Sequence, residues 1–272
     1  MRLALSNLAY PAVTAEGLLP RLAAMGLTGI EVAPTRLAPW DALSDGALRG
    51  HRGMLAGMGL CVSSLQAILF GAEGVALLGE AASFERLVSH LARVAEVGAV
   101  LGASVAVLGA PRQRARGALA AEEAFRLGAE RLRRAAETMQ AGGGPVLGLE
   151  PVPAAYGGDF LETWQEALAM VRAVDHPWLR LHLDTACVHL GGGDIAEAVA
   201  AGIDELAHFH LAEPKLVPFD APRADHAGAA AALTRVGYGG WLSIEMMERA
   251  EDPEGAAVEA VTFALAIYGT AA

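Results

Sequence analysis

The sequence predicts an α/β fold, a (β/α)8 TIM barrel built as one domain over residues 1–272. Eight short apolar runs alternate with eight amphipathic segments along the chain. No stretch rich in Pro, Ser or charge is long enough to link two domains. The length of 272 residues suits a single barrel, and a hydrophobic content of 54% allows a large core.

The strands are expected at the apolar runs 2–7, 28–33, 60–66, 103–109, 145–150, 179–184, 206–211 and 241–246. Helices are expected in the Ala-, Leu-, Arg- and Glu-rich segments near 14–25, 41–58, 83–98, 121–140, 161–173, 193–201, 225–236 and 254–268. Eight strands, each followed by a helix, fit a closed barrel better than an open doubly wound sheet.

Several residues mark the expected helix ends. Thr14, Ser83 and Thr163 stand where helices should begin, because a short hydroxyl side chain can accept a hydrogen bond from a free backbone N–H. Glycines stand where three helices should end, at Gly26, Gly59 and Gly142.

Charge and cysteine content limit the possible settings. The formal net charge of −11 disfavours nucleic acid as a partner. The most apolar stretch, residues 97–110, is interrupted by glycines and too short to cross a membrane, and no signal-peptide pattern opens the chain. The two cysteines, Cys61 and Cys187, lie far apart and give no disulfide framework. A reduced, cytoplasmic location is therefore expected.

Four residues of metal-binding types stand at the C-terminal ends of expected strands: Glu150, Asp184, His210 and Glu245. Successive members are separated by about the 30 residues of one strand-plus-helix unit. In a barrel they would meet on the rim where barrel enzymes keep their active sites. Three carboxylates and one imidazole would make a divalent-metal site there. The oxygen-rich set favours Mn²⁺, Mg²⁺ or Co²⁺, and the single His keeps Zn²⁺ possible.

A second polar layer is expected one step below these four residues. Side chains two positions apart point to the same side of a strand, so His182, His208 and Ser243 should also point into the barrel. A core built only for stability would place Val, Ile or Leu at such positions. Glu31 and Gln66 also end expected strands.

The segments around these residues resemble the xylose isomerase-like TIM-barrel superfamily, which includes D-tagatose 3-epimerase, hydroxypyruvate isomerase, inosose dehydratase and endonuclease IV. The resemblance covers essentially the whole chain and is strongest over residues 146–246. It is carried by Gly148–Pro151, Leu183–Thr185, His208–Pro214 and Gly237–Glu245. These motifs identify the superfamily rather than a substrate.

The resemblance implies that Glu150, Asp184, His210 and Glu245 bind the metal and that the two glutamates also exchange protons with the substrate. The chemistry agrees, because a metal that holds a sugar's carbonyl and hydroxyl oxygens stabilises an enediolate and makes the adjacent C–H acidic. The leading hypothesis is a metal-dependent isomerase or epimerase that acts on a small-molecule carbohydrate: a sugar, polyol or sugar acid. Relatives commonly form homo-oligomers, which is possible here as well.

The substrate-binding residues depart from those of better-known relatives. Cys187 stands where many relatives have a His that contacts the substrate or a second metal, and it could bind a soft metal or be buried. Tyr156 lies in the stretch that corresponds to a substrate-facing Glu of the epimerases. After Glu213, the nearby cation is Lys215 rather than the family's Arg. All four are expected near the substrate.

Gln66 and Arg112 complete the expected substrate-binding set. Arg112 and Arg114 follow the fourth strand, and an Arg at a barrel mouth suits a carboxylate or phosphate on the substrate. Alternatively, Arg112 and Arg114 could be solvated cations of the loop. Trp40 and Phe70 could wall the pocket or simply pack.

Three alternative functions follow from the same residues. A sugar or inosose dehydratase or lyase would begin with the same proton abstraction. A more remote alternative is an endonuclease IV-like phosphodiesterase, but the loops after strands two and three lack His, and Asp225 and His226 are adjacent rather than in the family's Asp-x-His spacing. A noncatalytic metal or sugar binder is the third.

Overall fold

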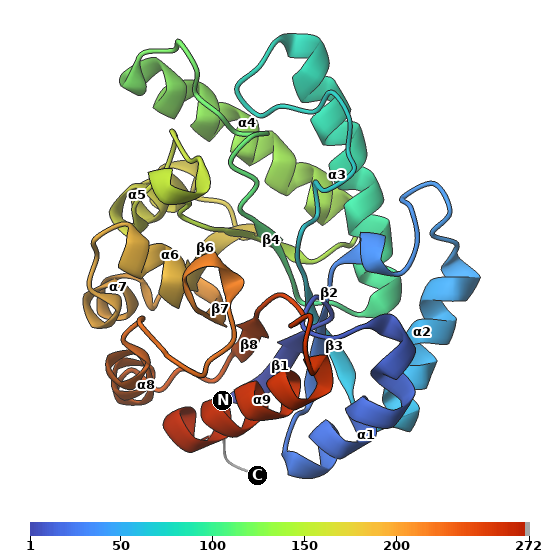
Figure 1. Cartoon of the computed structure of the whole chain (residues 1–272). Helices are drawn as coiled ribbons and strands as arrows, with labels where there is room; N and C mark the ends of the chain where they lie inside the picture. Colours follow the sequence, from blue (N-terminus) through green and yellow to red (C-terminus); the bar gives the residue numbers. More distant parts are fainter. Residues whose placement is uncertain (270–272) are drawn as a thin grey trace.

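Eight parallel strands close into a barrel in the computed structural model, which describes residues 1–269 (Figure 1). Each strand pairs with its neighbour in sequence, and β8 pairs with β1 to close the ring. The strands are β1 Arg2–Ser6, β2 Gly29–Val32, β3 Cys61–Leu65, β4 Val105–Leu108, β5 Val146–Leu149, β6 Leu179–Asp184, β7 Leu206–Ala212 and β8 Trp241–Glu245. The predicted fold class is therefore confirmed.

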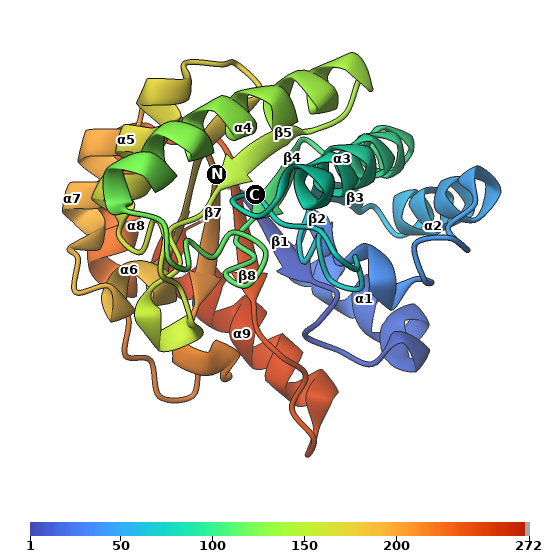
Figure 2. The same ribbon diagram turned by 90° about the horizontal axis from the view of Figure 1, so that it is seen from above.

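Nine α-helices within residues 1–269 surround the strands, as the view from above shows (Figure 2). They are α1 Ala15–Met25, α2 Asp45–Gly57, α3 Ala81–Leu101, α4 Ala121–Ala141, α5 Trp164–Val174, α6 Thr185–Leu190, α7 Ile195–Gly202, α8 His226–Arg235 and α9 Pro253–Tyr268. Short 3-10 helices lie in the loops at η1 Ala12–Thr14, η2 Pro34–Arg36, η3 Ala154–Tyr156 and η4 Pro214–Leu216. No helix of this part of the chain is both long and apolar enough to span a membrane.

The predicted helix boundaries hold at some ends and fail at others. Thr163 caps α5 in a reciprocal capping box with Glu166, as its sequence position indicates. Thr14 precedes α1, but its hydroxyl donates to Pro11 O instead of accepting from the helix. Ser83 lies inside α3, which begins after Glu80, and its hydroxyl donates to the Glu80 carbonyl. The expected start of α3 at Ser83 was therefore wrong by two residues.

Alternation along the strands separates an apolar outer face from a polar interior. Outward side chains join the core between barrel and helices, and Leu181 of β6 packs directly beneath Gly202 of α7. The buried interior side chains of β6, β7 and β8 include imidazoles and a hydroxyl: His182, His208, His210 and Ser243. Buried polar side chains therefore lie inside the barrel toward the C-terminal ends of its strands.

Candidate metal centre

The structure brings the four predicted metal-binding residues together. Glu150 directly follows β5, Asp184 ends β6, His210 lies on β7 and Glu245 ends β8. Each offers one ligand atom, and these four atoms all lie within 4.8 Å of one another. His210 Nδ1 lies 3.3 Å from Glu245 Oε2 and 3.7 Å from Asp184 Oδ2. Consecutive strands of one rim therefore supply a compact cluster of three carboxylates and one imidazole.

The cluster has the properties of a cation site. Asp184 Oδ2 and His210 Nδ1 are buried and have no hydrogen-bond partner among the described residues. Burial, followed by the charges of Asp184 and Glu245, raises the pKa of Glu150 well above its usual range. Burial and the neighbouring Glu245 raise the pKa of Asp184 to about 7. A divalent cation would satisfy the orphaned atoms and relieve this crowding of like charges, so the residues fit a metal ion.

A buried arginine supports the backbone of Glu150. Arg114, in the loop after β4, is 2% exposed, and its Nη1 donates to the Glu150 carbonyl at 2.6 Å. Its Nη2 donates to the Leu161 carbonyl. Burial lowers the pKa of Arg114 to about 10, which still leaves the guanidinium charged at neutral pH. Arg114 therefore anchors the loop after β5 instead of facing solvent.

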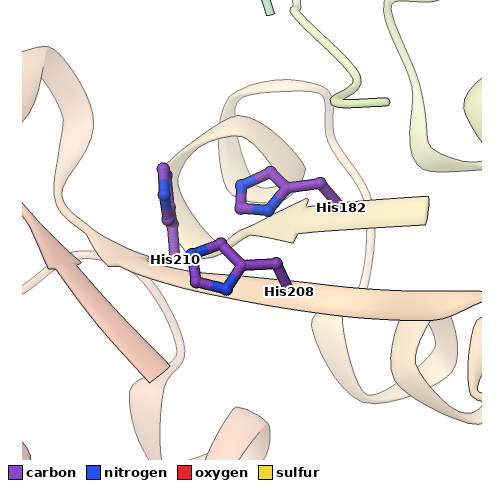
Figure 3. Close-up of side chains that lie close together, drawn as sticks. All are labelled: His182, His208 and His210. Atoms are coloured by element: carbon purple, nitrogen blue, oxygen red, sulfur yellow. The ribbon is translucent and has the colours of Figure 1, made fainter. Parts of the chain in front are cut away.

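His210 of the quartet also belongs to a group of three imidazoles inside the barrel, with His182 and His208 (Figure 3). The ring of His210 stands edge-on to that of His182, with 4.1 Å between centroids, while His182 and His208 are stacked at 5.3 Å. Burial is the main cause of the lowered pKa values of His182 and His208, so both rings are neutral near pH 7. His182 Nε2 lies 3.5 Å from Glu150 Oε1, which places this ring directly against the quartet.

Glu31 is a central member of the site to which the sequence assigned no role. It lies on β2, its side chain is fully buried, and its carboxylate meets Nε2 of both His208 and His210. Burial acts to raise the pKa of Glu31, but the charge of His210 and the hydrogen bonds from His208 and His210 outweigh it and hold the pKa well below its usual range. The signal available in the sequence was a single charged residue, Glu31, within the otherwise uncharged run 28–33 of an expected strand.

A cavity of about 440 Å³ opens over the quartet. Glu150 and Glu245 line it, together with Gln66 and Arg112. Gln66 is 2% exposed, and neither atom of its amide has a hydrogen-bond partner among the described residues. Arg112 is exposed at the edge. The remaining wall is mostly apolar and includes Leu8, Ile68, Leu69, Phe70, Val107, Pro111 and Leu216.

Tyr156 and Lys215 join two rim loops. The Tyr156 hydroxyl accepts a hydrogen bond from the backbone N–H of Lys215 at 2.7 Å, and the Lys215 side chain is exposed. Burial raises the pKa of Tyr156 to about 12, so the phenol stays protonated. Cys187 is buried in α6, where its N–H donates to Asp184 Oδ1 at 2.6 Å. Burial and the nearby Asp184 raise the pKa of its thiol well above the usual range.

Glu213 is fully buried and is not among the residues that line the cavity. Its fully buried carboxylate accepts hydrogen bonds from the N–H groups of Arg223 and Ala224 and lies 2.8 Å from His226 Nε2. Asp225 caps α8 by accepting a hydrogen bond from Gly228. The Glu213 carboxylate therefore fixes the loop before α8, and Asp225 and His226 lie outside the metal quartet.

The family described as xylose isomerase-like TIM barrel matches residues 19–266 of the chain. No curated protein sequence matches it significantly. Among solved structures, a D-allulose 3-epimerase from Methylomonas sp., solved in complex with D-allulose, is 21% identical with a TM-score of 0.80, covering 98% of this chain and 97% of that one.

Two further structures have other activities in their names. A 3-keto-D-glucoside 4-epimerase from E. coli is 19% identical with a TM-score of 0.78, covering 97% of this chain and 98% of that one. A probable 3-DHS dehydratase from Bacillus anthracis is 14% identical with a TM-score of 0.76 and the same coverage. At these identities the likeness shows a shared fold. The family match extends over nearly the whole barrel, and this chain belongs to the xylose isomerase-like TIM barrel family.

Proposed function

We propose that this protein is a metal-dependent isomerase or epimerase that acts on a small sugar, polyol or sugar acid. One observation carries the proposal: Glu150 and Glu245 belong to the cation cluster and also line the cavity above it. A substrate in that cavity would therefore meet two carboxylates at the position of the ion. Such an arrangement suits proton abstraction next to a carbonyl group.

The metal would be held by Glu150, Asp184, His210 and Glu245. When bound there, a divalent ion supplies Lewis acidity to carbonyl and hydroxyl oxygens of a substrate. Mn²⁺, Mg²⁺ or Co²⁺ suits the three carboxylates best, and the imidazole also allows Zn²⁺. Asp184 and His210 hold the ion only, because neither lines the cavity.

The two glutamates divide the proton transfer. One carboxylate takes the proton from the carbon next to the carbonyl, and the other returns a proton to a carbon of the substrate. Epimerisation requires a carboxylate on each face of that carbon, and two glutamates from different strands can meet this need.

Substrate recognition is assigned to Gln66 and Arg112. Gln66 offers the cavity a free N–H donor and a free carbonyl acceptor, which matches a hydroxyl group. Arg112 stands at the edge, where it would meet a carboxylate or another anionic group. Tyr156 and Lys215 are proposed to hold the rim loops together. Cys187 and Glu213 contribute through the backbone groups that they fix.

The test is turnover of purified protein, reconstituted with Mn²⁺, against panels of ketoses, inososes and sugar acids. Glu150→Gln and Glu245→Gln should each lower kcat by about 100-fold or more, the usual contribution of a positioned acid or base. Glu251→Gln removes an exposed carboxylate and serves as the control. Full turnover by the Glu150→Gln, Glu245→Gln double variant would rule out the proposed mechanism.

The same site supports a second reaction, the elimination of water from a hydroxy-carbonyl compound. It would begin with the same proton abstraction, and the glutamate that took the proton could then return it to the departing hydroxyl, so that water leaves. Mass spectrometry of the products separates the two reactions. An isomer keeps the mass of the substrate, whereas a dehydratase product lacks one water.

A further inference from the structure

We propose that Glu31 is a positioning residue that holds the imidazole of His210 through its Nε2 and thereby points the Nδ1 lone pair at the metal quartet. This inference rests on the metal site of the proposed function. It gives a role to a fully buried carboxylate that is not itself a member of the quartet.

The contact spans the interior of the barrel. Glu31 lies on β2 and His210 on β7, and three strand pairings separate them around the ring. His210 Nε2 lies 2.8 Å from Oε1 and 3.1 Å from Oε2 of Glu31. His210 Nδ1 lies on the other edge of the ring, toward Glu245 and Asp184. One nitrogen therefore faces a supporting carboxylate and the other faces the cation cluster.

The identity of the two partners determines where the proton resides. An ionised carboxylate can only accept hydrogen bonds, so Nε2 must carry the N–H that lies between His210 and Glu31. A neutral imidazole with its proton on Nε2 has its lone pair on Nδ1, where it can bind an ion. The opposite tautomer would point an N–H at the ion and block this bond. A carboxylate behind a metal-binding histidine also makes the ring a stronger ligand.

Three further donors fix the orientation of the Glu31 carboxylate. Oε2 accepts from Ser64 Oγ at 2.6 Å and lies 3.0 Å from His208 Nε2, while Oε1 accepts from Ser243 Oγ at 3.1 Å. All these side chains are fully buried. The donors come from β3, β7 and β8, so the surrounding barrel sets the direction in which Glu31 meets His210. A fortuitous contact would not require this much support.

The test compares Mn²⁺ binding, measured by calorimetric titration, for the wild type, Glu31→Gln, Glu31→Asp and Ser64→Ala. Glu31→Gln keeps the size of the side chain but replaces one acceptor oxygen with an N–H₂ donor. Its Mn²⁺ dissociation constant should rise by about 10- to 100-fold, the usual effect of losing such a partner. Glu31→Asp, which keeps the charge, should recover part of the loss. Ser64→Ala removes one of the bonds that orient the same carboxylate and should raise the Mn²⁺ dissociation constant by less than Glu31→Gln does, because His208 and Ser243 still hold Glu31.

A spectroscopic measurement reports on the ring itself. Nitrogen-15 NMR of the Zn²⁺-loaded wild type should show His210 with its proton on Nε2 and the ion on Nδ1, and Glu31→Gln should lose this signature. Thermal unfolding of the metal-free variants measures any general damage, which a purely structural role would cause in Ser64→Ala as well. If Glu31→Gln does not fold, the inference is tested by the His210 tautomer in the Zn²⁺-loaded wild type and by the Mn²⁺ affinity of Glu31→Asp.

Two results would overturn the inference: Mn²⁺ affinity in folded Glu31→Gln equal to that of the wild type, or a wild-type His210 that bears its proton on Nδ1 in the Zn²⁺ form. A wild type that binds no divalent ion would overturn both this inference and the proposed function. A protein that binds Mn²⁺ and needs Glu31 for it, but turns over no carbohydrate, contradicts only the proposed function.

Discussion

Gly109 leaves open the space that the Glu150 carboxylate occupies. A Cβ atom at position 109 would overlap Oε2 of Glu150, and it would also approach Val152. Gly109 directly follows β4, the strand that pairs with β5 below Glu150. The absence of a side chain at this position is therefore a condition for the Glu150 carboxylate to reach the quartet.

We predict that Gly109→Ala weakens metal binding while leaving the fold intact. The added methyl group would overlap Glu150 Oε2, the far end of a flexible side chain, so the carboxylate is the group that must move. The Mn²⁺ dissociation constant should rise by on the order of 10- to 100-fold. Gly46→Ala is the matched control, since a Cβ on that helical glycine meets nothing within 4 Å. Equal Mn²⁺ affinity in the two variants would contradict the prediction.

We predict that Gln66→Leu changes stability and activity in opposite directions. The amide is buried without a partner, which costs about 1–3 kcal/mol, so its replacement should raise the free energy of unfolding by about 1 kcal/mol. Loss of a hydrogen bond to the substrate should lower kcat/KM by about tenfold. Denaturant unfolding and steady-state kinetics measure the two effects. Gln113→Leu, at a partly exposed position of the same cavity, should produce neither.

We predict that Glu213→Gln destabilises the protein without raising KM. The Glu213 carboxylate accepts hydrogen bonds from the backbone N–H groups of Arg223 and Ala224. In the Gln variant, the side-chain NH₂ group would face one of these N–H donors, so one hydrogen bond would be lost. The expected loss in the free energy of unfolding is about 2 kcal/mol. Chemical denaturation gives the stability, and kinetics at saturating metal give KM. A raised KM with unchanged stability would instead indicate that Glu213 contacts the substrate.

We predict that His51 contributes to the loss of folding stability at acidic pH. It is partly buried, its Nε2 has no partner among the described residues, and burial lowers its pKa in the folded protein. The unfolded chain, with a pKa of about 6.5, therefore binds a proton before the folded one does. Stability is fully present above that value and falls as the pH drops through it toward the lower folded pKa.

Urea unfolding at several pH values between 7.5 and 5 measures this effect. The wild type should lose more stability over that range than His51→Gln, and the difference between the two isolates His51 from the other histidines. NMR titration of the wild type gives a direct check. A His51 that titrates at or above 6.5, or identical pH slopes in the two proteins, would exclude this contribution.

The barrel could be predicted from the sequence because its signals are local. Alternation in short apolar runs placed the β8 strand to within one residue, and the spacing of strand ends indicated which four residues would share one rim. These patterns are set by neighbours in the chain. They can be recognised in the sequence without knowing which distant side chains are in contact.

The parts that could not be predicted depend on contacts between distant residues or on a single side chain. Glu31 receives its role from partners 33 to 212 positions away, at Ser64 and Ser243. The short helix α6 lies between the expected strand 179–184 and the expected helix 193–201, and the Asp184 carboxylate caps it by accepting from Cys187 N–H. Glu213 was expected near the substrate from the family resemblance, which says nothing of the contacts that its carboxylate makes. Its carboxylate is bonded to the segment before α8 and to His226.

The loop after β4 contains two arginines with opposite environments. Arg114 is buried and holds the Glu150 carbonyl, whereas Arg112 is exposed at the edge of the cavity. The loop therefore separates two structural tasks within three residues. A substitution at position 112 would change the edge of the cavity without touching Glu150, whereas one at position 114 would release the backbone of Glu150. The substrate preference of the proposed enzyme could therefore be altered at this loop while the quartet stays unchanged.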